Sequence, residues 1–204
     1  MKVHVVAGDI CGFSGDVIVN AANGVLLGGG GVDGAIHRAA GPKLREACEA
    51  VPSEPNFCLG AGGVEMLGER CPVGSVRPTP AFNLPCKWVF HTVGPVWPVR
   101  VPEDADPKIR IHNIGEIYEA SKILSSCYTK ALSLAFAMDL KSIAFPAIST
   151  GVYGCPHEEC AYRASKAVLE FQSNRELDVT FYIYPSIHLG IWIQAMKNAG
   201  VYLE

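Results

Sequence analysis

Residues 20–37 read Asn-Ala-Ala-Asn-Gly-Val-Leu-Leu-Gly-Gly-Gly-Gly-Val-Asp-Gly-Ala-Ile-His, and this stretch decides the fold. Four consecutive glycines cost backbone entropy, so they are expected where bare N–H groups must come close to something. They lead into a predicted helix, whose N-terminus adds partial positive charge. A flexible turn is the plainer alternative, but turns seldom need four glycines. The stretch therefore predicts an anion-binding loop.

Residues 147–156 read Ala-Ile-Ser-Thr-Gly-Val-Tyr-Gly-Cys-Pro and form a second loop of this kind. It leaves an apolar segment and enters a predicted helix, with proline at N1 and two glutamates in the first turn, both favourable there. Its glycines, hydroxyls and helix N-terminus form a second cradle for an anion. Two cradles on one sheet edge suggest a diphosphate held from both sides.

The rest of the chain alternates short apolar segments with helical periodicity. Strands are predicted over 3–6, 16–19, 88–93, 142–147 and 179–184, and helices over 34–50, 117–138, 156–171 and 189–198. Gly41-Pro42 should interrupt the first helix, residues 52–85 resist assignment, and the proline-rich residues 94–107 should be a surface excursion. The alternation predicts one domain over 1–204, with a largely parallel sheet covered on both faces and ligands at the carboxyl ends of its strands.

Composition excludes several classes of protein. A net charge of −3 argues against a nucleic-acid protein that relies on phosphate neutralisation, but not against a small anion held by backbone N–H groups. No apolar run approaches the ~18 residues of a membrane span. His4 and Asp9 make the N-terminus a poor signal peptide, so a cytoplasmic location is expected. A monomer without metal or cofactor is the expected form.

The eight cysteines form no CxxC pair, and reduced, mostly buried thiols are expected. Cys155 precedes a helix and could act as a nucleophile, but no histidine or amide partner for it is evident. The anion loops lack the Gly-Lys-Ser/Thr ending of a nucleoside triphosphatase. Gly29 to Gly34 match G-x-G-x-x-G, but they do not directly follow a strand, so this dinucleotide fingerprint is a chance match.

Together the motifs resemble the MacroD type of macro domain. The resemblance rests on Gly8-Asp-Ile10, residues 16–23 (Asp-Val-Ile-Val-Asn-Ala-Ala-Asn), residues 27–42 around the glycine run, His91-Thr-Val-Gly-Pro95 and residues 145–154 (Phe-Pro-Ala-Ile-Ser-Thr-Gly-Val-Tyr-Gly). It covers nearly the whole chain in the family's order. It implies a three-layer α/β/α fold around a mixed, mostly parallel six-stranded sheet, with ADP-ribose, O-acetyl-ADP-ribose and mono-ADP-ribosylated proteins as partners.

The resemblance also assigns roles to residues. Asp9 would accept from the adenine amino group, Tyr184 would stack on adenine, and Tyr153 would cover the distal ribose. Asn23 and Asp33 would be catalytic, holding that ribose and the water. The ligand-binding set is Asp9, Ile10, Asn20, Gly28, Gly29, Gly30, Gly31, Val32, Ser149, Thr150, Gly151, Val152, Tyr153 and Tyr184.

Simpler structural roles stay open for several of these side chains. Asp9 could cap a turn, Tyr184 could be core, and Asn20 is expected to be mainly structural. His37 and His91 are expected to be packing or capping residues. The chain also departs from the family pattern: Gly74-Ser-Val stands where Gly-Glu-Ala is usual, residues 99–116 look longer, and Pro185 follows Tyr184.

Glycosyl hydrolysis usually needs two carboxylates, yet only Asp33 is well placed. An ADP-ribose ester of Asp or Glu releases a carboxylate whose conjugate acid has a pKa of ~4, so its departure needs little protonation. The sequence therefore predicts substrate-assisted hydrolysis of such esters and of O-acetyl-ADP-ribose. The alternative is a module that reads ADP-ribose without turning it over.

Overall fold

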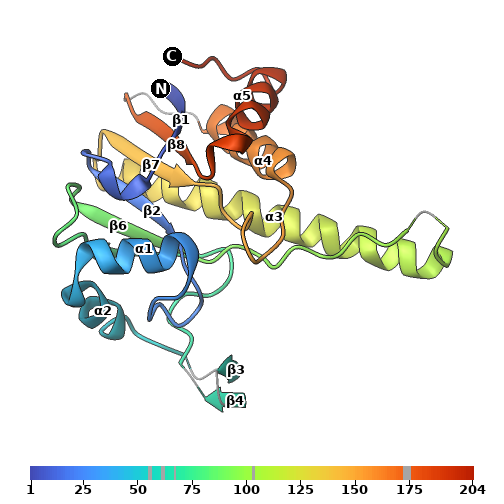
Figure 1. The fold of residues 1–204 in the computed structure, drawn as a ribbon, viewed down its shortest axis with the longest axis horizontal. Coiled ribbons are helices and arrows are strands. Elements are labelled where there is room, and N and C mark those ends of the chain that lie inside the picture. The colour runs from blue at the N-terminus through green and yellow to red at the C-terminus, as the bar shows by residue number, and fades with distance from the viewer. Residues whose placement is uncertain (55–56, 61–62, 67, 103, 172–175) are drawn as a thin grey trace.

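The computed structural model describes residues 1–54, 57–60, 63–66, 68–102, 104–171 and 176–204. Within them a mixed six-stranded sheet has the order β1-β8-β7-β2-β6-β5 (Figure 1). Its strands are β1 (Lys2–Ala7), β2 (Val17–Ala21), β5 (Val76–Pro80), β6 (Trp88–Thr92), β7 (Ser142–Pro146) and β8 (Asp178–Ile183). Adjacent strands are parallel except β5, which is antiparallel to β6. Strand β5 lies at the sheet's edge, where its prolines are tolerated.

The strands alternate their side chains between two separate apolar cores. Val17 and Val19 of β2 enter one core, whereas Ile18 enters the other. Helices α3 (Pro107–Ala137), α4 (His157–Glu170) and α5 (Leu189–Asn198) cover the first face. Helices α1 (Gly31–Ala40) and α2 (Pro42–Glu49) cover the second face. The predicted three-layer α/β/α fold with a mixed, mostly parallel sheet is confirmed.

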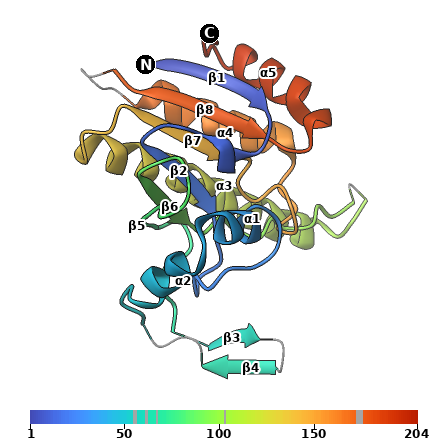
Figure 2. The same ribbon diagram turned by 60° about the vertical axis from the view of Figure 1, so that its left-hand side comes forward.

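Smaller elements connect or extend these layers. A 3-10 turn, η1 (Ile10–Gly12), follows β1, and a second, η2 (Ser186–His188), precedes α5. The antiparallel pair β3 (Phe57–Gly60) and β4 (Gly63–Met66) stands away from the main sheet (Figure 2). These strands and β5 fall within residues 52–85, which sequence patterns do not assign.

Two helix boundaries were predicted wrongly. The first helix starts at Gly31 and not at 34, with Gly30 as its N-cap, a position at which glycine is well tolerated although glycine is unfavourable inside a helix. The predicted break at Gly41 (φ 82°) is confirmed. Helix α3 starts at Pro107 and not at 117, so half of the segment 99–116 is helical. Asp106 accepts a hydrogen bond from the backbone N–H of Lys108, and a proline at N1 suits a helix start.

The thiols behave as the sequence predicts. All seven cysteines whose side chains the structure describes are free, and five of them are buried. Across the described residues, every helix is too short or too polar to cross a bilayer.

Candidate functional site

The predicted site residues come together at one edge of the sheet. Strands β1, β8, β7 and β2 are parallel neighbours, so the loops after them leave from the same edge. The two glycine-rich loops follow β2 and β7, which lie side by side. Asp9 follows β1 and Tyr184 follows β8, which are also paired. The candidate site is therefore this carboxyl edge, as expected for a parallel sheet.

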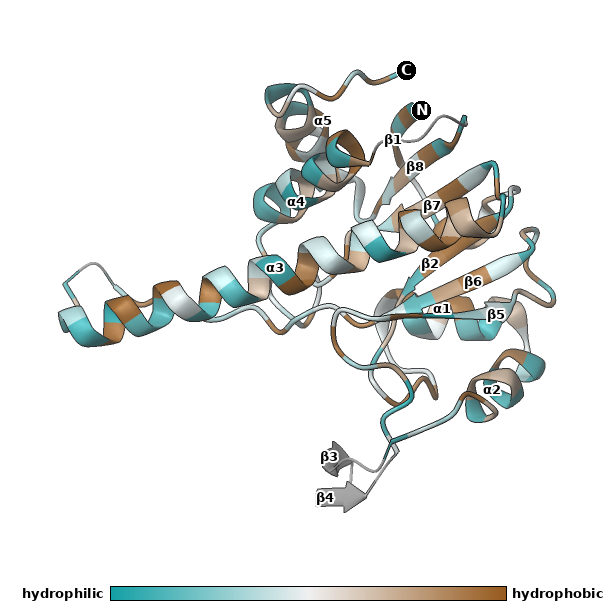
Figure 3. Ribbon diagram, turned by 180° about the vertical axis from the view of Figure 1, so that it is seen from behind, coloured by the Kyte–Doolittle hydropathy of each residue, from teal (hydrophilic) through white to brown (hydrophobic). Residues whose placement is uncertain are grey.

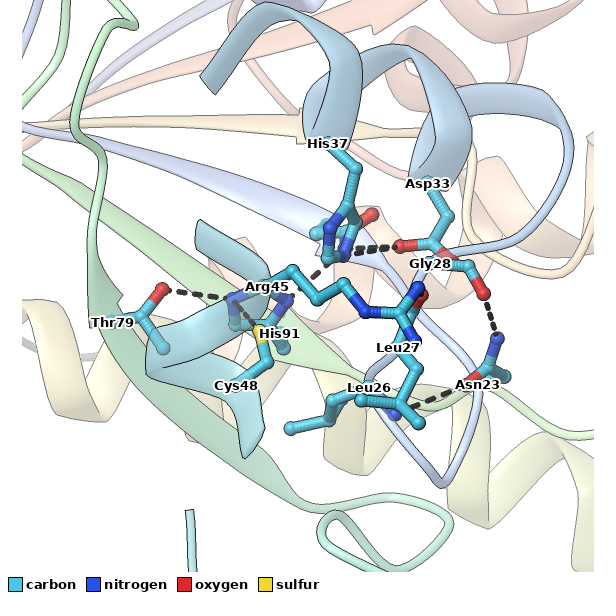
Figure 4. A network of polar contacts seen from close by, with 11 residues as sticks. Asn23, Leu26, Leu27, Gly28, Asp33, His37, Arg45, Cys48, Thr79 and His91 are labelled. Atoms are coloured by element: carbon cyan, nitrogen blue, oxygen red, sulfur yellow. Dashed lines mark hydrogen bonds and ion pairs between the residues drawn. The ribbon is translucent and has the colours of Figure 1, made fainter. Parts of the chain in front are cut away.

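Asn23 shapes the first loop with its side chain. Its Nδ2 donates to the carbonyl of Gly28 at 2.9 Å, and its Oδ1 accepts from the backbone N–H of Leu26 at 3.1 Å (Figure 4). Leu26 is fully buried and has a φ of 60°. Gly28 has a φ of 85°, and a Cβ added to it would lie 3.4 Å from the His37 ring. The amide of Asn23 keeps a second N–H, which leaves one donor for a ligand or water.

Asp33 is the buried carboxylate of the site. It lies in the first turn of α1 and is 4% exposed. Its Oδ1 accepts from Asn20 Nδ2 at 2.7 Å and lies 3.5 Å from His37 Nε2, whereas its buried Oδ2 has no hydrogen-bonding partner within the described residues. Burial raises the pKa of Asp33, and the hydrogen bond from Asn20 and the charge of His37 partly oppose that rise. One oxygen is thus fixed and the other is free to act.

The free oxygen of Asp33 faces the glycine run. A Cβ at Gly29 would lie 3.1 Å from Asp33 Oδ2 and 3.3 Å from Asn23 Nδ2. A Cβ at Gly34 would overlap the carbonyl oxygen of Gly29. The approach of the loop to α1 therefore requires glycine at position 34, whereas a side chain at position 29 would crowd the Asp33 carboxylate and the Asn23 amide.

A polar chain runs from Asp33 into the core. The Nδ2 of Asn20 also lies 3.1 Å from His91 Nδ1. His91 Nε2 in turn lies 2.9 Å from Thr79 Oγ1 (Figure 4). Burial lowers the pKa of His91 to about 3, so its ring is neutral. With Nδ1 accepting from Asn20, the proton sits on Nε2 and is donated toward Thr79.

Sequence patterns predict structural roles for Asn20 and His91, but not that the two are linked. They are directly opposite each other in the β2–β6 pairing, on the same face of the sheet. Both are fully buried. Local sequence patterns do not give the strand register, and the register determines which side chains on adjacent strands are neighbours.

A histidine–cysteine group lies under α1 and α2. Single atoms of His37, Cys48 and His91 all lie within 4.8 Å of one another. Burial raises the pKa of the Cys48 thiol to about 12, and both ring nitrogens of His91 have hydrogen-bonding partners. We assign the group to core packing around Asp33.

The second loop closes on its own backbone. The N–H of Cys155 donates to the carbonyl of Ser149 at 2.9 Å, and that of Gly154 to Gly151 at 2.9 Å. Ser149 is buried with φ 64°, and its hydroxyl has no partner within the described ranges. The N–H of Trp97 donates to the carbonyl of Tyr153 at 2.7 Å, which ties the loop after β6 to this one. Thr150 is half-buried, whereas Val152 is fully exposed.

The two residues predicted to bind adenine lie after the paired strands β1 and β8. Asp9 is exposed and caps η1, because its Oδ1 accepts from the backbone N–H of Cys11 at 2.9 Å. This is its simpler structural role, and it leaves Oδ2 available. Ile10 is buried below it. Tyr184 is 80% exposed, so the alternative that it is a core residue is wrong.

Two other features, Cys155 and a groove between α4 and α5, are weaker candidates for a functional site. Cys155 is buried, and its thiol donates to the carbonyl of Pro156 at 3.6 Å, so a nucleophilic role for this cysteine is not favoured. A groove of about 670 Å³ lies between α4 and α5, with Glu158, Tyr162 and Gln194 among its lining residues. None of the predicted site residues lines this groove, and it lacks a buried charge or a glycine-rich loop.

The chain is similar to known proteins over most of its length, including both glycine-rich loops. Residues 19–164 match the Macro domain family. The chain is 46% identical over 177 residues to a macro domain-containing protein of Xanthomonas campestris, covering 87% of this chain and 84% of that protein. It is 46% identical over 181 residues to the O-acetyl-ADP-ribose deacetylase of Escherichia fergusonii, covering 89% and 86% of the two chains.

Solved structures agree with the fold. The macrodomain of Oceanobacillus iheyensis with ADP matches with a TM-score of 0.73 and 37% identity, covering 95% of this chain and 89% of that one. The macrodomain of Trypanosoma brucei in complex with ADP-ribose matches with a TM-score of 0.71 and 32% identity, covering 95% and 68%. The sheet order, the two loops and these matches together establish that the chain belongs to the macro domain family.

Proposed function

We propose that this chain binds ADP-ribose and hydrolyses its esters, releasing mono-ADP-ribose from Asp and Glu side chains and acetate from O-acetyl-ADP-ribose. One observation carries the proposal: the buried carboxylate of Asp33 has a free oxygen at a helix N-terminus, next to a second anion loop. Relatives 44–46% identical that are named O-acetyl-ADP-ribose deacetylase support the acetyl-ester activity.

In the proposed complex the carboxyl edge binds the ligand from end to end. The free Oδ2 of Asp9 accepts from the adenine amino group beside the Ile10 backbone, and the exposed ring of Tyr184 stacks on the base. The diphosphate lies between the two loops, Gly28 to Val32 and 149–153, where backbone N–H groups point at it. This placement uses the four parallel strands whose loops share one edge.

The distal ribose then lies next to Asp33. The free oxygen of Asp33 and the second N–H of Asn23 hold the ribose and a water, while a phosphate oxygen of the substrate orients that water. For an Asp or Glu ester, water attacks the anomeric carbon of the distal ribose while the bond from that carbon to the ester oxygen breaks. The side chain leaves as its carboxylate, the water oxygen becomes the ribose hydroxyl, and the remaining proton passes to solvent. An Asp beside an anion is costly because the charges are alike, and this cost supports a chemical role.

The test compares wild type with Asp33→Ala on a protein mono-ADP-ribosylated on glutamate, and on O-acetyl-ADP-ribose. We expect wild type to release ADP-ribose and the variant to lose at least about 100-fold in turnover while still binding ADP-ribose. Equal hydrolysis by the variant at saturating substrate would contradict the role of Asp33.

Two further outcomes discriminate between functions. Binding of ADP-ribose without any release would make the chain a reader and remove the catalytic half of the proposal. An arginine-linked ADP-ribose has a far more basic leaving group and should resist cleavage. Efficient cleavage of that linkage would contradict the proposed ester selectivity.

A further inference from the structure

The outer part of α3 stands clear of the rest of the molecule (Figures 1 and 3). We call this segment, residues 107–119, the arm, and at 1.5 Å per residue it is about 20 Å long. The structure describes every residue of the arm, and among them only Asn113 is buried. The buried core residues of α3 begin at Ala120, and the half-buried Ile117 packs against that core. Most of the arm is therefore a surface that the molecule's own core does not require.

The inner side of the arm is already covered. Asn113 Nδ2 donates to the carbonyl of Val99 at 2.9 Å, and its Oδ1 accepts from the N–H of Val101 at 3.5 Å. These bonds fasten the chain that precedes the helix to the side of the arm that carries Asn113. The outer side is not covered by this segment.

That outer side is apolar. Ile111, Ile114 and Tyr118 are 71%, 64% and 61% exposed, and their spacing of three and four residues forms one stripe. Scattered exposed apolar residues are ordinary, but a contiguous stripe bordered by charges is typical of an interaction site. Gly115 lies beside the stripe, with open space above it in the described residues, so a second helix can approach closely.

The charges next to the stripe favour a second copy of the same helix. At 100° per residue, Lys108, Glu119 and Lys122 lie along one flank of the stripe. If a second arm packs antiparallel, centred near residue 114, Lys108 of one copy lies opposite Glu119 of the other. A parallel arrangement would instead place Lys108 against Lys108. Glu119 already pairs with Lys122 of the same helix at 3.3 Å, both side chains being exposed. Of the two directions, the antiparallel one places Lys108 opposite this carboxylate.

We propose that two copies of this chain pair antiparallel through their arms, with Ile111, Ile114 and Tyr118 at the centre of the contact. The bodies attach beyond Ala120, so antiparallel arms hold them at opposite ends of the pair. Two helical faces of this length bury less than a standard interface of about 1,600 Å², which is typical of weak, transient complexes, so we expect a dimer that forms only at high protein concentration. Such a dimer departs from the monomer that the sequence alone predicts.

Sedimentation velocity of the full chain from about 1 to 500 µM tests the pairing. Wild type should shift from monomer to dimer mass across this range, and Ile114→Ser should weaken the dimer at least about tenfold. Thermal unfolding of this variant should be unchanged, because the side chain is exposed. A monomer at every concentration would overturn the proposal, as would a dimer whose Kd ignores Ile114→Ser.

Charge reversal tests the antiparallel register. Lys108→Glu and Glu119→Lys should each weaken self-association about fivefold, because each places like charges opposite one another. A mixture of the two single variants should form mixed pairs with a Kd within about twofold of wild type. In a mixed antiparallel pair, position 108 of each copy lies opposite a residue of opposite charge at position 119 of the other. Lys43→Glu, an exposed reversal on α2, is the control and should have no effect. Failure of the mixture to pair better than either variant would overturn the register.

Discussion

The two glycine-rich loops lie side by side at the carboxyl edge but are held in place differently. The loop after β2 is fixed by buried polar side chains: Asn23 bonds to the loop's own backbone, and Asn20 holds Asp33. The loop after β7 is held by backbone bonds such as that from Cys155 to Ser149, and by hydroxyl bonds such as that from Thr150 Oγ1 to the carbonyl of Ala147 at 2.9 Å. Of the two loops, only the first is shaped by amide side chains and a buried carboxylate.

The loops also leave different atoms free. The first leaves a carboxylate oxygen of Asp33, and the second leaves the hydroxyl of Ser149. A carboxylate can orient water and ribose, whereas a hydroxyl beside backbone N–H groups suits a phosphate. Substitutions that displace the Asp33 carboxylate should therefore change turnover and its pH dependence, whereas loss of the Ser149 hydroxyl should change ligand affinity.

The largest effect is expected at Gly29. Alanine there places Cβ 3.1 Å from Asp33 Oδ2, so the carboxylate must move by a few tenths of an ångström. Because small displacements of catalytic groups are costly, turnover should fall about 100-fold while the Kd for ADP-ribose changes less than about threefold. Steady-state kinetics and calorimetry measure the two quantities. Gly190→Ala in α5, where a Cβ meets open space, is the matched control and should behave as wild type.

Asn20→Ala should have the next largest effect. It removes the amide that lowers the pKa of Asp33, so that pKa rises further and the acid limb of turnover moves to higher pH. Losing a hydrogen bond to a charged group should also reduce turnover at neutral pH about 10- to 30-fold. Thr92→Val, a buried polar change one residue after His91, controls for lost stability. An unshifted acid limb in Asn20→Ala would remove the positioning role.

The contrast between the loops explains which features the sequence could reveal. Glycine runs, helix starts and short β-branched segments are local signals, so five of the six strands of the main sheet and both loops were predictable from residues near one another in the chain, whereas the role of Asp33 came from the family resemblance. The opposing positions of Asn20 and His91 depend on strand register, which local patterns do not encode.

The start of helix α3 escapes prediction for a different reason. Sequence patterns place its first ten residues in or next to a proline-rich excursion, although Asp106 and Pro107 form a start signal for a helix. Its outward-facing stripe of Ile111, Ile114 and Tyr118 and its exposed charges obscure the expected core-facing stripe. A helix that leaves the core lacks the single apolar face by which helices are recognised.

A smaller effect is expected at Ser149. Removing its hydroxyl should weaken ADP-ribose binding up to about tenfold and leave turnover at saturation unchanged. Two variants separate the hydroxyl from the backbone, because Ser149 has φ 64°, which favours glycine. Ser149→Gly and Ser149→Ala should weaken binding equally, but only the alanine variant keeps the backbone strain and should be less stable. A fall in turnover equal to that of the Gly29 variant would erase the distinction between the loops.

The smallest effect at neutral pH is expected at His91. This ring lies in the buried polar chain under the first loop, so the support of that loop should be sensitive to acid. The folded protein keeps this ring neutral with a pKa of about 3, whereas the unfolded chain titrates near 6.5. Below pH 6.5 the unfolded state therefore binds more protons, and stability should fall by about 1.4 kcal/mol per pH unit down to about pH 3.

His91→Gln keeps an acceptor for Asn20 and removes the titration, so this contribution should vanish from the variant. Urea unfolding at about pH 7, 6 and 5 measures it as the difference in slope between the two proteins. His157, whose pKa burial also lowers, contributes equally to both and cancels. Asp33 acts with the opposite sign, because its raised pKa adds stability as the pH falls. Equal slopes would mean that His91 makes no contribution to the pH dependence of stability. The buried polar chain under the first loop would then differ from the second loop's bonds in geometry alone.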